Sequence, residues 1–297
     1  MKTAQAEYQI DLDAYFDRLG YTGPTDCSLQ TLSALQLRHQ QIIAFENLDP
    51  FLNRPVDIDL PAIEQKLVFS ERGGYCYEQN LLFAHVLQRL GFTVSNLIAR
   101  VQWGAEDDQI SPRSHMLLHV RIDHRPYIVD VGFGGNSIPT PIVLNRENPQ
   151  QTQYGLYRCL LIDGEYWLQL GTEQGWRSMY RFELTRQEPA DYIPVNYFTS
   201  THDSSHFRHS IIAARIFQNG RYTLLNNQLT KRYRDGQMHK TILESAQETQ
   251  DALLDVFGIQ VPDMTLFARR WQEISQGWEK GARSAPRQSP DQVAQQA

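Results

Sequence analysis

The sequence contains little cysteine: only Cys27, Cys76 and Cys159 occur in 297 residues. They are too few and too scattered for a disulfide framework or a zinc site. We therefore predict no disulfide and no metal. Reduced thiols are typical of the cytoplasm, which is the location we expect.

Long apolar runs and an excess of basic charge are also lacking. No uncharged apolar stretch approaches the roughly 20 residues that span a bilayer, and residues 1–7 lack the apolar core of a signal peptide. The 28 Lys and Arg residues are outnumbered by 34 Asp and Glu residues, for a net charge of −6. Nucleic acid binding needs a concentrated basic face, so we expect neither a nucleic acid nor a membrane as partner.

What is present is a three-part pattern. Residues 1–95 carry apolar positions at helical spacing, with Asp11 and Ser28 as candidate N-caps. Residues 96–195 read as closely spaced antiparallel strands that suggest a small barrel, with His124-Arg125-Pro126 in a turn and a hairpin at Asp163-Gly164. Residues 196–297 mix a hairpin with helices at 247–257 and 266–274, and a disordered tail is predicted from about 277.

The most informative segment surrounds the second cysteine and reads Arg72-Gly73-Gly74-Tyr75-Cys76-Tyr77-Glu78-Gln79-Asn80. Two glycines precede the thiol, which opens an amphipathic helix. A thiol at a helix N-terminus lies at the positive end of the macrodipole, which favours the nucleophilic thiolate. We therefore interpret Cys76 as a nucleophile, whereas Cys27 and Cys159 have no activating group nearby.

Two partners for this nucleophile follow in the sequence. His115 lies in Ser114-His115-Met116, and Asp130 interrupts the apolar run 127–131. A carboxylate in such a run is costly to bury unless it is paired, and an imidazole N–H would pair with it. Cysteine, histidine and aspartate together form a nucleophile, a base and an orienting group, which indicates an enzyme.

The glycine-rich segment 132–135 allows two interpretations. As a phosphate-binding loop it is weak, because no helix with a following lysine is evident. The preferred interpretation is that glycines such as Gly134 let the backbone approach a thioester closely, while Phe133 forms a wall of the acceptor pocket.

Together these segments strongly resemble the arylamine N-acetyltransferase family. The resemblance rests on 72–80, 114–118 and 130–134, with further likeness at Phe45-Glu46-Asn47-Leu48 and at 196–207, and it covers about residues 8–275. Ser114 stands where many relatives have threonine, and both residues carry a hydroxyl group.

The resemblance implies an α+β fold with a cysteine-protease-like core. Its parts are an N-terminal helical bundle (1–95), a central antiparallel β-barrel (96–195) and a C-terminal segment with an α/β lid (196–297). It also implies acetyl transfer from acetyl-CoA to arylamines and arylhydrazines, with O-acetylation of N-arylhydroxylamines. We predict a ping-pong reaction through S-acetyl-Cys76.

The resemblance also supports roles for residues around the three central ones. Arg72 and Glu46 are expected to form an ion pair that fixes the cysteine loop. Candidates for binding acceptor or coenzyme, including Ser114, are drawn from the strands and from the hydroxyl-rich stretch 199–205: Phe45, Val101, Ser114, Phe133, Gly134, Thr199, Ser200 and Phe207.

Three other readings remain open. A cysteine hydrolase of the papain or transglutaminase kind shares the order Cys, His, Asp. A related enzyme could use another acyl group, as do the amide synthases that close macrolactams or a malonyl-specific relative. A binding module without catalysis is the third reading, and an intact set of Cys76, His115 and Asp130 argues against it.

Overall fold

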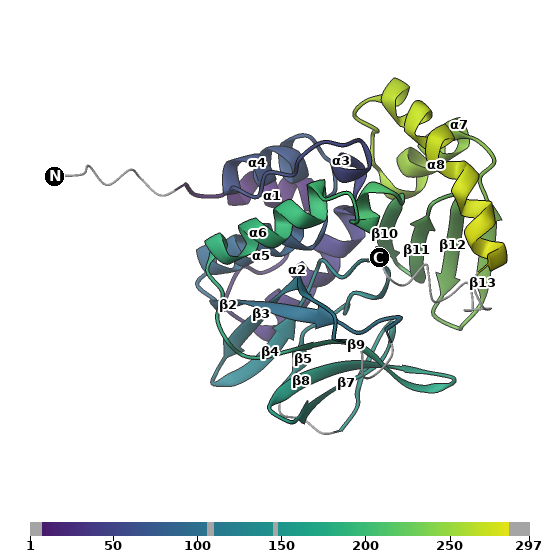
Figure 1. Cartoon of the computed structure of the whole chain (residues 1–297). Helices are drawn as coiled ribbons and strands as arrows, with labels where there is room; N and C mark the ends of the chain where they lie inside the picture. The colour runs from purple at the N-terminus through teal and green to yellow at the C-terminus, as the bar shows by residue number, and fades with distance from the viewer. Residues whose placement is uncertain (1–7, 106–109, 145–147, 285–297) are drawn as a thin grey trace.

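The computed structural model describes residues 8–105, 110–144 and 148–284. Its first third is mainly helical (Figure 1). It contains α1 (Leu12–Leu19), α2 (Leu29–Ile42), α3 (Leu48–Phe51), α4 (Leu60–Glu64), the π-helical turn η1 (Gln65–Phe69) and α5 (Cys76–Arg89). Asp11 caps α1 by accepting from the Ala14 N–H at 3.0 Å, and Ser28 caps α2 in the same way. Both helix starts agree with the sequence prediction.

The middle of the chain forms an antiparallel sheet of eight strands that curves into a nearly closed barrel. The strand order is β5-β4-β3-β2-β9-β8-β7-β6. The bounds are β2 (Thr93–Val101), β3 (Arg113–Ile122), β4 (Arg125–Val129), β5 (Ile142–Val143), β6 (Gln150–Thr152), β7 (Gly155–Ile162), β8 (Glu165–Thr172) and β9 (Gly175–Phe182). The predicted α+β fold with a central barrel is confirmed.

Strand β3 belongs to the barrel and packs against helix α5. Met116, Leu118 and Val120 pack into the cluster that contains the α5 side chains, whereas Leu117 belongs to the barrel core. This alternation is the period of two that a strand imposes. His115 therefore faces the same side as Leu117, where its ring meets the barrel residues Phe133 and Tyr180.

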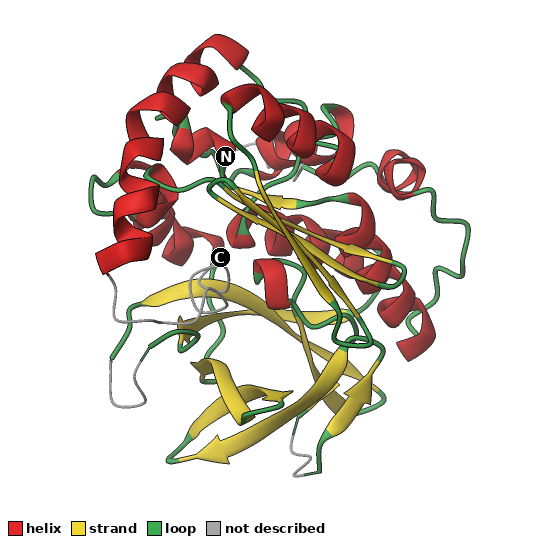
Figure 2. Cartoon of the chain, turned by 90° about the vertical axis from the view of Figure 1, so that its right-hand side faces the viewer, coloured by secondary structure: helices red, strands yellow, loops and turns green. Residues whose placement is uncertain are grey.

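The last third builds a second antiparallel sheet. Helix α6 (Pro189–Thr201) and the turn η3 (His206–Arg208) lead into β10 (Ile212–Phe217), β11 (Gly220–Leu225), β12 (Gln228–Tyr233) and β13 (Met238–Ile242). Helices α7 (Ala246–Phe257) and α8 (Met264–Ser284) pack on this sheet. Figure 2 shows the helices and this sheet on one side of the molecule and the barrel on the other.

Three local features differ from the sequence prediction. Residues Phe45–Glu46 form strand β1, which pairs with β10 as the edge of the C-terminal sheet. The turn after β3 is Asp123–His124, both with positive φ, so Arg125 and Pro126 already belong to β4.

Helix α8 also continues past 277, where a disordered tail was expected to begin. Trp271, Ile274 and Trp278 extend its apolar stripe onto the C-terminal core, which accounts for the longer helix. Residues 285–297 of the expected tail lie outside the described residues. Within the described ranges, no helix combines the length and apolar character needed to cross a membrane.

Candidate active site

Cys76 is the first residue of α5, and a side chain from the same helix shapes the chain entering it. Glu78 Oε2 accepts a hydrogen bond from the Tyr75 N–H at 3.0 Å, which satisfies one of the free donors at the helix start. Cys76 is 7% exposed, and its Sγ lies 3.9 Å from the Ser114 carbonyl oxygen. The sulfur is thus nearly enclosed beside β3.

The His115 side chain contacts that of Cys76, and Asp130 in turn pairs with His115. His115 Nε2 is 2.7 Å from Asp130 Oδ2, so Nδ1 is the ring nitrogen left for the sulfur side. Burial alone would lower the pKa of His115. The charge of Asp130, their hydrogen bond and a contact with the Cys76 side chain outweigh it and raise the pKa to about 10. The geometry therefore favours a protonated imidazole beside the thiol.

The Asp130 carboxylate is fully buried, and four donors compensate its charge. His115 and the Tyr180 hydroxyl, the latter at 3.0 Å, share Oδ2. Asn80 Nδ2 at 3.1 Å and the Gly132 N–H at 2.8 Å share Oδ1. These four hydrogen bonds offset the cost of burying the carboxylate and hold it in one orientation.

Asn80 and Tyr180 were not singled out from the sequence. Asn80 also donates to the Met116 carbonyl at 2.8 Å and accepts from the Val131 N–H at 3.1 Å. It therefore ties α5 to β3 and to the segment after β4. The sequence signal that could have singled out Asn80 is a polar residue among the apolar residues of the cysteine helix.

Gly132 is the glycine that approaches the cysteine most closely. A Cβ atom there would lie 2.7 Å from Cys76 Cα and 2.8 Å from Asn80 Nδ2, which is too close for any side chain. Gly134, the position expected from the sequence, instead lines a small cavity of about 10 Å³ facing β10 and β11.

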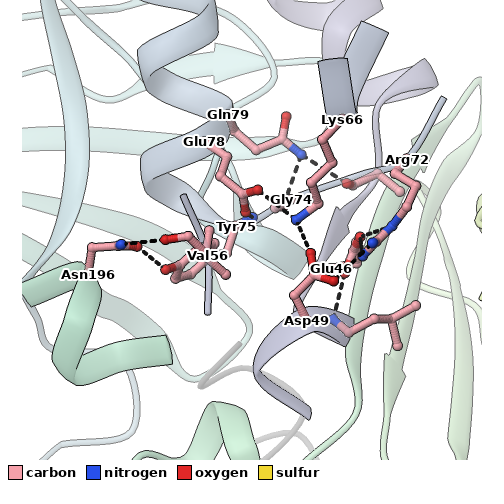
Figure 3. Close-up of polar contacts among 12 residues, drawn as sticks. Glu46, Asp49, Val56, Lys66, Arg72, Gly74, Tyr75, Glu78, Gln79 and Asn196 are labelled. Atoms are coloured by element: carbon pink, nitrogen blue, oxygen red, sulfur yellow. Dashed lines mark hydrogen bonds and ion pairs between the residues drawn. The ribbon is translucent and has the colours of Figure 1, made fainter. Parts of the chain in front are cut away.

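A buried group of five charged residues supports the cysteine loop (Figure 3). Lys66 Nζ lies 2.7 Å from Asp49 and 2.6 Å from Glu78. Arg72 lies 2.6 Å from Glu46 and 3.0 Å from Asp49. Burial raises the pKa of Glu78 to about 7 against the opposing effect of Lys66. The group links α3, η1 and β1 to the first turn of α5.

A cavity of about 680 Å³ opens above Cys76 and His115. Six of the expected binding residues line it: Phe45, Val101, Ser114, Phe133, Thr199 and Phe207. Trp103 and His206, which were not expected, also line it. Ser200 does not, because its side chain is buried and donates to the Asn196 carbonyl at 2.8 Å.

A second cavity, of about 560 Å³, lies between the barrel and the C-terminal sheet. Its walls include four arginines and two acidic residues: Arg177, Arg221, Arg232, Arg234, Glu173 and Asp235. Trp103 lines both cavities. Asn136 also lines the second cavity, and the buried donors Trp103 Nε1 and Asn136 Nδ2 have no hydrogen-bond partner within the described residues.

Comparison with known proteins agrees with this geometry. A model of the N-acetyltransferase family matches residues 28–266. Arylamine N-acetyltransferases from Escherichia coli and Mycobacterium tuberculosis are each 38% identical to this chain. They cover 85% and 86% of it, and 90% and 91% of their own lengths.

The solved structures give the same result. The arylamine N-acetyltransferase of Mycobacterium marinum superposes with a TM-score of 0.86 at 37% identity, covering 89% of this chain and 99% of its own. The same protein in complex with CoA gives a TM-score of 0.85 at 36% identity, with the same coverage. The chain thus belongs to the arylamine N-acetyltransferase family and is an acyltransferase.

Proposed function

We propose that the protein transfers the acetyl group of acetyl-CoA to arylamines and arylhydrazines through an acetyl thioester on Cys76. One observation carries the proposal. Cys76 opens a helix at the floor of an aromatic cavity, beside a His115–Asp130 pair joined at 2.7 Å. An imidazolium stabilises a neighbouring thiolate, and a thiolate attacks thioesters readily.

In the resting pair, His115 already holds the proton of the Cys76 thiol, so the first half-reaction starts from a thiolate beside an imidazolium. The thiolate attacks the acetyl carbonyl carbon, the bond from that carbon to the CoA sulfur breaks, and CoA leaves with the proton from His115. We assign stabilisation of the transient oxyanion to backbone N–H groups at the start of α5, which have no partner within the helix.

In the second half-reaction, the amine nitrogen attacks the acetyl group on Cys76. His115 accepts the amine proton, and the Cys76 thiolate is released. Phe45, Phe133 and Phe207 form apolar walls that suit a flat aromatic acceptor. An N-arylhydroxylamine would present its oxygen at the same position. A relative from Salmonella typhimurium, 36% identical, is named as both an N- and an O-acetyltransferase.

We place the phosphate groups of acetyl-CoA in the second cavity. Guanidinium groups are the preferred partners of phosphates, and four arginines line this cavity. Trp103 Nε1 and Asn136 Nδ2 offer buried N–H donors without a protein partner. Trp103 borders both cavities, which supports a coenzyme that extends from the arginines to Cys76.

Intact-mass spectrometry after mixing the protein with acetyl-CoA tests the proposal. We expect a single acetyl adduct on Cys76, its absence in Cys76→Ser, and its removal by an arylamine. Without amine, CoA release should stop near one equivalent. An adduct that persists in Cys76→Ser would exclude this nucleophile, and continuous CoA release would identify a hydrolase instead.

A further inference from the structure

Arg221 is a buried arginine, 9% exposed, on strand β11. Its Nη1 donates to the carbonyl oxygens of Gly135 and Ser137, each at 2.9 Å, and its Nη2 donates to the Tyr157 hydroxyl at 2.9 Å. Among the described residues no carboxylate forms an ion pair with it. A charged side chain is therefore used to hold neutral backbone carbonyls, at a considerable desolvation cost.

Arg221 holds the segment 130–138, which directly follows strand β4. The segment leaves Asp130, whose carboxylate is fixed by four donors, and reaches Ile138, whose carbonyl accepts from Gln36 and Gln40 at 2.8 Å each. Between these anchored ends lie Gly134 and Gly135, which contribute no side chain to packing. Arg221, which lies on strand β11 of the C-terminal sheet, holds the middle of this segment.

Phe133 stands at the start of this held stretch. Its ring centroid is 5.0 Å from that of His115 and 5.0 Å from that of Tyr180, and it lines the cavity above Cys76. A shift in the backbone of 134–137 would move the Phe133 ring relative to His115 and change the acceptor wall. Small displacements at a reacting centre are costly to catalysis.

We propose that Arg221 is a positioning residue for the transfer reaction, holding 134–137 so that Phe133 stays against His115. The proposal rests on the function proposed above. The competing role is that of a phosphate ligand only, because Arg221 also lines the second cavity. The two roles differ in their dependence on the acetyl donor.

Steady-state kinetics with two donors tests the proposal, using acetyl-CoA and p-nitrophenyl acetate, which has no phosphate. We expect Arg221→Met to raise the KM for the arylamine about tenfold with either donor, since tenfold corresponds to about 1.4 kcal/mol. Arg221→Lys should behave similarly, because one ammonium group cannot span three acceptors. The matched control is Arg125→Met, an exposed arginine on β4, which should leave the arylamine KM unchanged with either donor.

An unchanged arylamine KM with p-nitrophenyl acetate in folded Arg221→Met would overturn the proposal. Loss of folded protein would lower the apparent kcat without moving KM, so a merely structural effect is distinguishable. If Arg221→Met does not fold, Arg221→Lys and Tyr157→Phe, which removes one of the three contacts, decide the question in the same assay. Absence of turnover by the unmodified protein with both donors would instead reject the proposed function.

Discussion

Asn80 Nδ2 donates to Asp130 Oδ1 at 3.1 Å and so joins helix α5, which begins with Cys76, to the carboxylate that pairs with His115. Asn80 lies one turn after Cys76 on α5, and both Asn80 and Asp130 are fully buried. The distance between Cys76 and Asp130 is therefore set by the neutral Asn80 amide as well as by His115. A helix shift would break this contact together with those to Met116 and Val131.

Asn80→Ala is expected to lose three buried hydrogen bonds. The stranded Met116 carbonyl and Val131 N–H should together cost about 2–4 kcal/mol of folding free energy. The rate of acetyl transfer in Asn80→Ala should be at least tenfold lower than in Gln88→Ala, a substitution at an exposed position of the same helix. Urea unfolding and single-turnover acetylation would measure the two effects. Equal acetylation rates in the two variants would show that Asn80 does not position Asp130.

Asp130→Asn and Tyr180→Phe should distinguish the effect of the Asp130 charge from the effect of a hydrogen bond that orients it. The asparagine variant removes the charge that keeps His115 protonated, and kcat should fall on the order of a thousandfold. Tyr180→Phe removes one donor to Oδ2 but keeps the ring beside Phe133, so the loss should be within about tenfold. Presteady-state bursts of CoA release would test both, and a larger loss in Tyr180→Phe would reverse this ranking.

Gly132→Ala should impair activity through sterics alone. The added methyl group would meet Cys76 Cα at 2.7 Å, so the start of α5 or the segment after β4 must move. We expect a destabilisation of about 1–3 kcal/mol and at least a tenfold loss of acetyl transfer. Gly277→Ala is the control, because no atom lies within 4 Å of its added Cβ. Matching activities in the two variants would contradict the close approach.

His39 should make folding stability depend on pH. It lies between the Tyr15 hydroxyl at 2.8 Å and Gln79 Oε1 at 2.6 Å. Burial lowers its pKa from 6.5 to about 4, against the contact with Gln79. Between pH 6.5 and about 4, His39 is therefore protonated in the unfolded chain and neutral in the folded chain. The stabilisation is full above 6.5 and is lost as the pH falls toward 4.

Urea unfolding at about pH 7 and pH 5 measures this effect. The native protein should lose about 2 kcal/mol more than His39→Gln over this interval, at about 1.4 kcal/mol per pH unit. His124→Asn, in an exposed turn with positive φ, should lose as much as the native protein. Parallel pH dependence of the native protein and His39→Gln would exclude His39 as the source.

Arg234→Ala tests the placement of the coenzyme phosphates. Its guanidinium lies 4.3 Å from the Tyr154 ring centroid and lines the second cavity. We expect the KM for acetyl-CoA to rise about tenfold, and the effect to shrink at high salt because the contact is electrostatic. Turnover of p-nitrophenyl acetate should be unchanged. An unaltered KM for acetyl-CoA would move the phosphates elsewhere.

The residues that perform chemistry and those that hold them differ in how well sequence predicts them. Cys76, His115 and Asp130, to which we assign the chemistry as a proposal, are conspicuous because a reactive or charged side chain interrupts an apolar or glycine-rich run. Asn80, Tyr180 and Arg221 are ordinary residues of regular helices and strands. Their contacts span up to 86 residues of sequence, as from Arg221 to Gly135, and local patterns contain no information on such pairings.

The same limit applies to the elements. The hairpin at Asp163-Gly164 follows from two residues whose φ values of 50° and 86° suit a tight turn. Strand β1 is two residues long, too short for any periodicity, and exists because β10 lies beside it. Gly132 and Gly134 look equivalent in the sequence, and only their neighbours distinguish them.

Strand β1 also has a consequence for how the enzyme is made. Phe45 pairs with Ala214 and Glu46 with Ala213. Strand β1 is therefore synthesised some 170 residues before the strand with which it pairs. Until then Phe45 lacks its partner strand β10, and His206 and Phe207 are missing from the wall of the cavity above Cys76. A polypeptide that ends before residue 206 would therefore leave β1 unpaired and would lack two wall residues of the cavity above Cys76, so truncation at the C-terminal end would damage the site as well as the sheet.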